Sequence, residues 1–116
     1  MSKRDTILLL DDMLQSARKI KLYTKNLNYE SFISDDKTID AVVRNFEIIG
    51  EAANRIDDGF RGLNPEIEWN RIRGFRNRIV HEYFGVDYEI VWVIIESYLD
   101  ELIDWLDTII TRNKAI

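Results

Sequence analysis

The order of apolar and polar positions along the chain predicts four long helices. In four stretches the apolar side chains recur every three to four residues, which is the spacing of one buried helix face. Asn64 followed by Pro65 favours the start of the third helix, and Gly85 is a typical residue for its end. The four predicted helices span residues 5–27, 36–57, 65–85 and 87–111.

Short connections between four helices predict an all-α fold, an up-and-down four-helix bundle. The polar connection at residues 28–36 leaves room for a short extra helix or turn, and either Ser34 or Asp35 can cap the helix after it. The segment "DDGFRGLN" has the composition of a turn. The segment "YEIVWVII" resembles a strand by itself, but the helical spacing continues as far as Ile109, so we expect a helix.

Three residues of the second predicted helix interrupt its apolar pattern. Glycine in a helix interior costs about 1 kcal/mol relative to alanine, so we expect Gly50 to allow the close approach of another backbone. Glu47 and Glu51 lie one helical turn apart, which is a weak signal for a divalent metal. Because the sequence contains no zinc-ligand spacing and no glycine-rich phosphate loop, we expect neither a metal nor a cofactor.

The composition places the chain among globular proteins with one domain. A chain of 116 residues supports a single hydrophobic core, so we expect one domain over residues 1–116. The absence of cysteine excludes disulfides and thiolate metal sites. No stretch approaches the roughly 20 apolar residues of a membrane span, and "MSKRDTILLLDDML" lacks the pattern of a signal peptide. We therefore expect a cytoplasmic protein without a membrane association.

The charge distribution limits how the chain can bind nucleic acid. The formal net charge is −5, which argues against a protein that coats RNA or DNA through bulk charge. Four arginines nevertheless fall within residues 71–78, namely Arg71, Arg73, Arg76 and Arg78. Any contact with a nucleic acid should therefore be local to this segment.

The string "RNRIVHEY", residues 76–83, contains the only histidine of the chain. On an ideal helix Arg76 lies in the apolar stripe, whereas Arg73, Asn77 and His81 form a separate row. Arg76 and His81 would then lie about 140° apart around the axis and about 7.5 Å apart along it. Either the helix distorts near its end or a second copy of the chain completes the site. We favour a two-fold homodimer, in which Arg76 of one chain faces His81 of the other.

The residues around this string resemble a known family. "GFRNRIVHEYFGVD" resembles the Arg-x4-His-x-Tyr signature of the HepT-like branch of the HEPN superfamily, and "IIGEAANRI", "PEIEWNRIRGFRN" and "YFGVDYEIVW" resemble the same branch. The resemblance extends over residues 44–92. It implies a HEPN-like bundle and a metal-independent endoribonuclease, the toxin of a type VII-like toxin–antitoxin pair. The implied antitoxin is a minimal (MntA-like) nucleotidyltransferase.

The resemblance also implies roles for the residues of the motif. Arg76 and His81 would be catalytic, Asn77 and Tyr83 would support them, and Tyr83 would be the target of nucleotidylation. The chemistry suits these residues, since a histidine can accept the proton of a ribose 2′-hydroxyl near neutral pH. A guanidinium can stabilise the charge that develops on the phosphate oxygens. The alternative function is a non-catalytic partner of the nucleotidyltransferase, in which Tyr83 serves only as its substrate.

The remaining arginines have both functional and structural interpretations. Arg73 and Arg78 would supply the phosphate affinity that the acidic chain lacks as a whole. Arg78 and Arg71 would equally suit a solvated helix face. An ion pair between Arg76 and either Glu47 or Glu51 across the bundle would be a structural alternative to catalysis.

Overall fold

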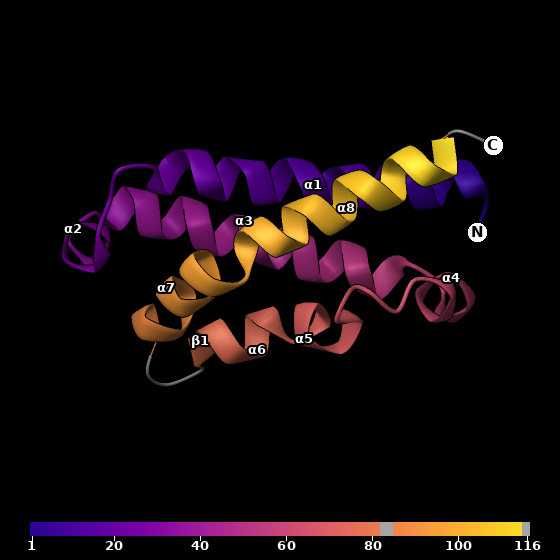
Figure 1. Cartoon of the computed structure of the whole chain (residues 1–116). Helices are drawn as coiled ribbons and strands as arrows, with labels where there is room; N and C mark the ends of the chain where they lie inside the picture. Colours follow the sequence, from indigo (N-terminus) through magenta and orange to yellow (C-terminus); the bar gives the residue numbers. More distant parts are fainter. Residues whose placement is uncertain (82–84, 115–116) are drawn as a thin grey trace.

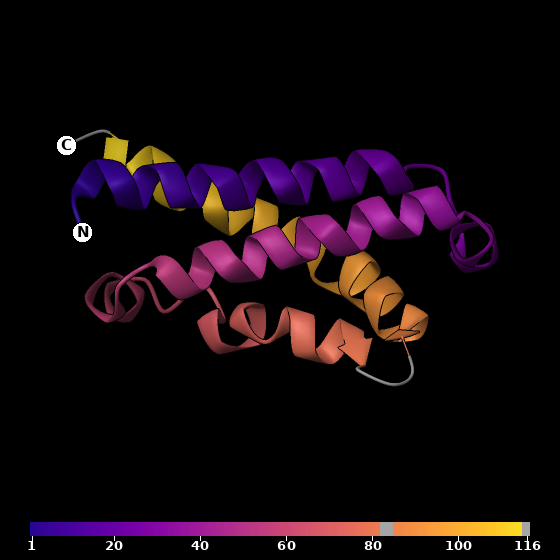
Figure 2. The same cartoon turned by 180° about the vertical axis from the view of Figure 1, so that it is seen from behind.

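The structure is a computed structural model that describes residues 1–81 and 85–114, with only the backbone of His81. Two long antiparallel helices, α1 (Lys3–Thr24) and α3 (Asp36–Arg55), pack along each other through most of their length (Figures 1 and 2). Helix α8 (Leu99–Lys114) covers α1, and the segment that carries the motif packs against α3. The described residues form an all-α bundle, which confirms the predicted fold class.

The first two predicted helices are confirmed, and their ends lie within a few residues of the predicted ones. The short helix α2 (Tyr29–Ile33) occupies the connection between them, as anticipated. Asp35 caps α3, because its carboxylate accepts hydrogen bonds from the backbone N–H and the hydroxyl of Thr38 at 3.1 and 2.7 Å. These hydrogen bonds lower the pKa of Asp35.

The third predicted helix, residues 65–85, is wrong at both ends. Asn64 does not begin a helix but ends the preceding short one. Its side-chain amide donates back to the carbonyl of Phe60 in that helix at 2.9 Å. Its own carbonyl accepts a hydrogen bond from the indole of Trp69 at 2.9 Å. The predicted turn at residues 57–64 is also wrong, because residues 58–63 form a short helix. The elements of this region are α4 (Asp58–Leu63), α5 (Trp69–Arg73) and α6 (Phe75–Ile79).

The chain leaves the helix after Ile79 and forms a small antiparallel hairpin. Strand β1 (Val80–His81) pairs with strand β2 (Gly85–Val86). Gly85 has a φ of 74°, a left-handed conformation that glycine adopts without steric cost. Gly85 therefore serves the hairpin instead of ending a helix. The backbone N–H of Asp87 donates to the carbonyl of Ile79 at 2.7 Å and holds the ends of the hairpin together.

The fourth predicted helix is observed as two successive helices. Helix α7 (Tyr88–Ser97) is capped by Asp87, whose carboxylate accepts from the backbone N–H of Ile90 at 3.1 Å. Tyr98 separates α7 from α8. The interpretation of "YEIVWVII" as a helix is thus confirmed. Among the described residues, no helix has the length and apolar character needed to cross a membrane.

Gly50 lies where α3 and α5 approach each other most closely. A Cβ atom placed on Gly50 would lie 3.3 Å from the carbonyl oxygen of Ile72 and 3.8 Å from that of Arg73. This geometry confirms the expected close backbone approach and shows that the approaching segment belongs to the same chain. Because α5 continues toward α6, this contact sets the position of the arginine-rich segment relative to the core.

Candidate functional site

The first two residues of the motif, Arg76 and Asn77, lie on a short helix that is anchored to the core on one side only. Ile72, Phe75 and Ile79 are buried, and they follow the helical spacing across α5 and α6. Arg76 and Asn77 are exposed. The prediction that Arg76 lies within the apolar stripe is therefore wrong. The predicted stripe included positions beyond Ile79, which are not helical, whereas the three buried positions on an ideal helix centre the stripe about 65° away from Arg76.

Arg76 is not used in an ion pair across the bundle. The side chain of Glu47 instead lies 3.7 Å from the guanidinium of Arg44 on its own helix. Within residues 1–81 and 85–114, the guanidinium of Arg76 makes no hydrogen bond or ion pair. The structural alternative involving Glu47 or Glu51 is thus not observed, and Arg76 is exposed without a carboxylate partner in the described part of the chain.

His81 follows the helix in an extended segment. Its backbone belongs to β1 and pairs with Gly85, while its side chain and the whole of Tyr83 lie outside the described residues. The separation from Arg76 that we calculated for a straight helix does not apply, because Val80 already has extended backbone angles, φ −110° and ψ 117°. Either a distorted helix or a second copy of the chain would bring the motif together. The helix is indeed interrupted, at Val80, which is earlier than the predicted end at Gly85.

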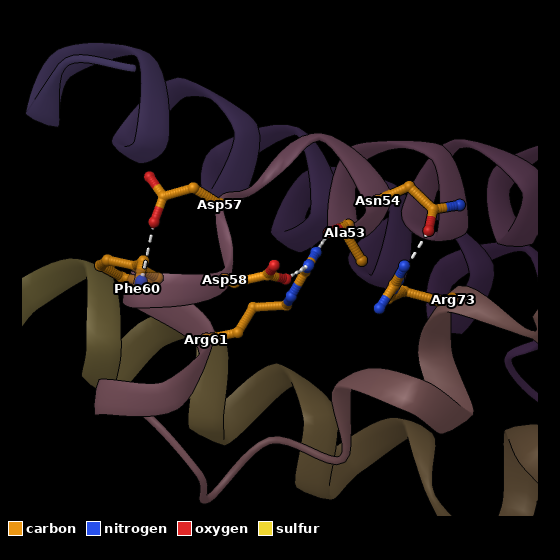
Figure 3. A network of polar contacts seen from close by, with 7 residues as sticks. All are labelled: Ala53, Asn54, Asp57, Asp58, Phe60, Arg61 and Arg73. Carbon is orange, nitrogen blue, oxygen red and sulfur yellow. Dashed lines mark hydrogen bonds and ion pairs between the residues drawn. The ribbon is translucent and has the colours of Figure 1, made fainter.

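Arg73 is held by a residue that is distant in the sequence. Its Nε donates to the side-chain oxygen of Asn54 at 2.7 Å, which joins α5 to the end of α3 (Figure 3). The side chain of Arg73 remains exposed. The structure places Arg78 on the exposed side of α6, in agreement with a solvated face. Asn54 belongs to the string "IIGEAANRI", but no sequence pattern indicates its contact with a residue 19 positions later.

Arg71 has a structural environment that the sequence did not indicate. It pairs with Glu68 at 3.1 Å, and its guanidinium carbon lies 4.0 Å from the centre of the Tyr98 ring. A guanidinium above an aromatic face is a favourable cation–π contact. Burial raises the pKa of Tyr98 to about 12, and the nearby carboxylate of Glu68 adds to this effect. Arg71 is therefore half-buried and has a structural role, so the expectation of a fully solvated side chain is wrong.

A cleft of about 530 Å³ lies between α4 and α5, next to this segment. Arg61 enters it from α4, donating to the carbonyl of Ala53 at 2.9 Å and pairing with Asp58 (Figure 3). Sequence reasoning did not single out Arg61, because it falls in a segment that was predicted to be a turn. Its contact with Ala53 depends on how α4 folds back on α3. The charged residues that line the cleft are Asp58, Arg61, Glu68, Arg71 and Arg73.

Carboxylates do not gather into a metal centre in the described part of the chain. There, no group of three or more histidine, aspartate and glutamate side chains is close enough to hold an ion. The pair Glu47 and Glu51 thus lacks a third ligand among these residues.

Comparison with known proteins identifies the family. The sequence model of the family described as "Ribonuclease HepT-like" matches residues 13–109. The chain therefore belongs to the HepT-like ribonuclease family, which confirms the resemblance inferred from the motif and its flanks. No solved structure matches the chain significantly.

Several curated relatives match this chain over most of their length. "Putative RNase MJ1380" of Methanocaldococcus jannaschii is 42% identical over 97 residues, which cover 84% of this chain and 89% of that protein. "Probable ribonuclease HepT" of Thermococcus cleftensis is 37% identical, with coverages of 80% and 84%. "Putative RNase TTE0752" of Caldanaerobacter subterraneus is 34% identical, with coverages of 90% and 94%. The similarity thus extends across the whole helical bundle.

Proposed function

We propose that this protein is a metal-independent endoribonuclease that acts on RNA in the cytoplasm as the toxin of a type VII-like toxin–antitoxin pair. The observation that carries the proposal is the placement of Arg76 in a chain of the HepT-like ribonuclease family. Arg76 is exposed and unpaired among the described residues. It lies five residues before His81, and α6 ends between the two. An exposed arginine five residues before a histidine provides the two kinds of side chain that cleavage of a phosphodiester needs.

The reaction needs only a base and an electrostatic stabiliser. His81 would accept the proton of a ribose 2′-hydroxyl as that oxygen attacks the adjacent phosphorus. The bond from phosphorus to the 5′-oxygen breaks, a cyclic phosphate forms, and the departing oxygen takes up a proton. Arg76 would donate hydrogen bonds to the phosphate oxygens, where negative charge concentrates in the transition state. Asn77 would orient the phosphate or the imidazole, and Tyr83 would contact the nucleotide.

Removing the two catalytic side chains provides the direct test. We expect Arg76→Ala and His81→Ala each to lower the cleavage rate of single-stranded RNA by about a hundredfold or more. Arg55→Ala is the matched control, because Arg55 is exposed at the end of α3 and lines a different groove. Wild-type activity should persist in EDTA. Full activity of both motif variants would refute the assignment.

We propose further that the working form is a homodimer whose sites combine Arg76 of one chain with His81 of the other. Mixed dimers test this arrangement, because a dimer of one Arg76→Ala chain and one His81→Ala chain retains one intact shared site. Random exchange of the two inactive variants should restore about a quarter of the wild-type activity. If each chain forms its own complete site, mixing restores nothing. Sedimentation measurements on the same samples establish whether dimers are present.

The proposed control acts on Tyr83. A nucleotidyltransferase antitoxin would attach a nucleotide to its hydroxyl, and the added phosphate would repel RNA from the motif. Co-expression with the neighbouring transferase and intact-mass measurement test this step, with Tyr83→Phe as the control. An unmodified tyrosine in the presence of an active transferase would contradict it. Modification of a protein that never cleaves RNA would instead support the non-catalytic alternative.

A further inference from the structure

The cleft between α4 and α5 has a positive lining in an acidic protein. Its lining includes three arginines and two carboxylates, whereas the whole chain has a formal net charge of −5. The two carboxylates are already paired, Asp58 with Arg61 and Glu68 with Arg71. The charge that remains uncompensated in the cleft is therefore that of Arg73.

Arg73 differs from the other bonded arginines in the kind of residue that holds it. In the part of the chain that the structure describes, the other arginines with a hydrogen bond or ion pair each contact a carboxylate. Arg73 is held only by the neutral amide of Asn54. An amide fixes the position of a guanidinium without neutralising it. Because the contact uses Nε alone, four of the five N–H donors of Arg73 remain free.

The neighbouring arginines are also fixed in place before any ligand arrives. Figure 3 shows Arg61 and Arg73 reaching toward Ala53 and Asn54, which are adjacent residues near the end of α3. Only 12% of the Arg61 side chain is exposed. Side chains that are already ordered lose little conformational entropy when a ligand binds. The cleft thus combines a free, oriented cation with a rigid wall.

The cleft ends at Arg73, two residues before the start of the short helix that carries Arg76. Gly74 alone separates α5 from α6, and it has φ −88° and ψ 0°, so the chain turns only slightly between Arg73 and Arg76. Three residues of helix advance by about 4.5 Å. Both arginines are exposed. A nucleic acid strand that runs from Arg76 toward α5 would therefore pass beside Arg73 and the mouth of the cleft.

We propose that the cleft between α4 and α5 binds a backbone phosphate of single-stranded RNA next to the cleavage site. Arg73 is the phosphate-binding residue, and Asn54 is a positioning residue that orients it. The planar guanidinium can present two parallel N–H groups to the phosphate oxygens. This inference rests on the proposed ribonuclease function, and it adds a second contact point that fixes the register of the RNA.

Substitution of Asn54 separates the charge of Arg73 from its orientation. Asn54→Asp keeps a hydrogen-bond acceptor but places a carboxylate against the guanidinium, which neutralises it. Asn54→Ala removes the acceptor and leaves the charge unchanged. Asn26→Asp is the matched control for the first variant, because it makes the same change at an exposed position between α1 and α2. Arg73→Gln removes the charge directly and serves if Asn54→Asp fails to fold.

The assay is the binding of a fluorescent 2′-O-methyl RNA, which cannot be cleaved, to the full chain at several salt concentrations. Each phosphate contact with a single strand contributes about 0.7 to the slope of log affinity against log salt. We expect Asn54→Asp and Arg73→Gln to lose this 0.7 and to bind about tenfold more weakly at 50 mM salt. The ratio of wild-type affinity to variant affinity should decrease roughly 2.6-fold between 50 and 200 mM salt. Asn54→Ala should bind more weakly with an unchanged slope.

The outcomes for the cleft and for the ribonuclease are distinguishable. If both charge variants retain the slope and affinity of Asn26→Asp, the cleft does not bind a phosphate, whatever the protein does to RNA. If wild-type protein fails to cleave unmodified RNA, the proposed function fails, while the binding slopes still decide the role of the cleft. Circular dichroism melts of each variant establish that the compared proteins are folded.

Discussion

Replacing Gly50 by alanine sets two opposing effects against each other. Alanine in a helix interior is more stable than glycine by about 1 kcal/mol. The new Cβ would lie 3.3 Å from the carbonyl oxygen of Ile72, which belongs to the backbone of α5 and cannot rotate away. Crowding that forces a backbone to shift costs roughly 1–3 kcal/mol. We therefore expect Gly50→Ala to lower the free energy of unfolding by about 1 kcal/mol.

Gly62→Ala is the matched control for this prediction. Gly62 lies in α4, and a Cβ atom added there meets nothing within 4 Å. This change should stabilise the protein by about 0.4–1 kcal/mol, mainly by restricting the unfolded chain.

Urea unfolding followed by circular dichroism measures both variants. For an m value of about 2 kcal/mol/M, the two midpoints should separate by roughly 0.7–1 M. The measurement is made at two protein concentrations, because association would make the stability depend on concentration. If Gly50→Ala stabilises the protein as much as the control does, our account of the contact between α3 and α5 is refuted.

Three further changes test packing and capping. Trp69→Phe leaves the carbonyl of Asn64 without its 2.9 Å donor, so we expect a loss of about 1–3 kcal/mol in the urea assay; unchanged stability would contradict the buried bond. Burial raises the pKa of Tyr98 to about 12, so Tyr98→Phe should remove a tyrosine step near pH 12 from an absorbance titration. The folded chain keeps a proton that the unfolded chain releases near pH 10, so stability should fall between about pH 10 and 12 through this residue. Hydrogen bonds from Thr38 lower the pKa of Asp35 below 3.8, so the contribution of this carboxylate exists above that pH and disappears as the pH falls through the lowered value. The stability difference between wild type and Asp35→Ala should therefore close in acid, and a constant difference would exclude the charge as its cause.

The long helices could be predicted because their signals are local. The apolar spacing of α1 and α3 persists over many turns, and no internal break interrupts it. The cap at Asp35 uses a side chain and a backbone N–H only three residues apart. Gly50 could also be interpreted correctly, since a glycine inside a strong helical pattern implies a close neighbour. The sequence could not identify that neighbour as α5.

The third helix could not be predicted, because Asn64 and Pro65 suit two different structures. Asparagine followed by proline favours a helix start, yet the side chain of Asn64 here closes the preceding helix onto Phe60. The contact that fixes this choice is the hydrogen bond from the Trp69 indole to the Asn64 carbonyl, which no periodicity encodes. The early end at Ile79 likewise depends on pairing between two strands of two residues each.

The sequence was sufficient to predict which residues form the candidate site, but not which of them are exposed or what surrounds them. The motif identified Arg76 and the family, whereas the exposure of Arg76 depends on which side of a short helix packs on the core. Arg61 lies outside the strings that resemble the family, and Asn54 lies in one of them without any signal of its partner. They become relevant only because α4 and α5 fold back onto the end of α3, where Arg61 and Arg73 find acceptors.

Because α6 ends at Ile79, the two catalytic candidates lie on elements of different stability, Arg76 on a helix packed against the core and His81 on a two-residue strand. Moving Arg76 requires Phe75 and Ile79 to leave the hydrophobic core, whereas the backbone of His81 is held by a ladder of two residue pairs. Opening such a ladder requires far less free energy than unfolding the bundle. If His81 is the base, as proposed, opening this ladder would move it while Arg73 and Arg76 keep their positions on the bundle, and cleavage would then stop while RNA remains bound.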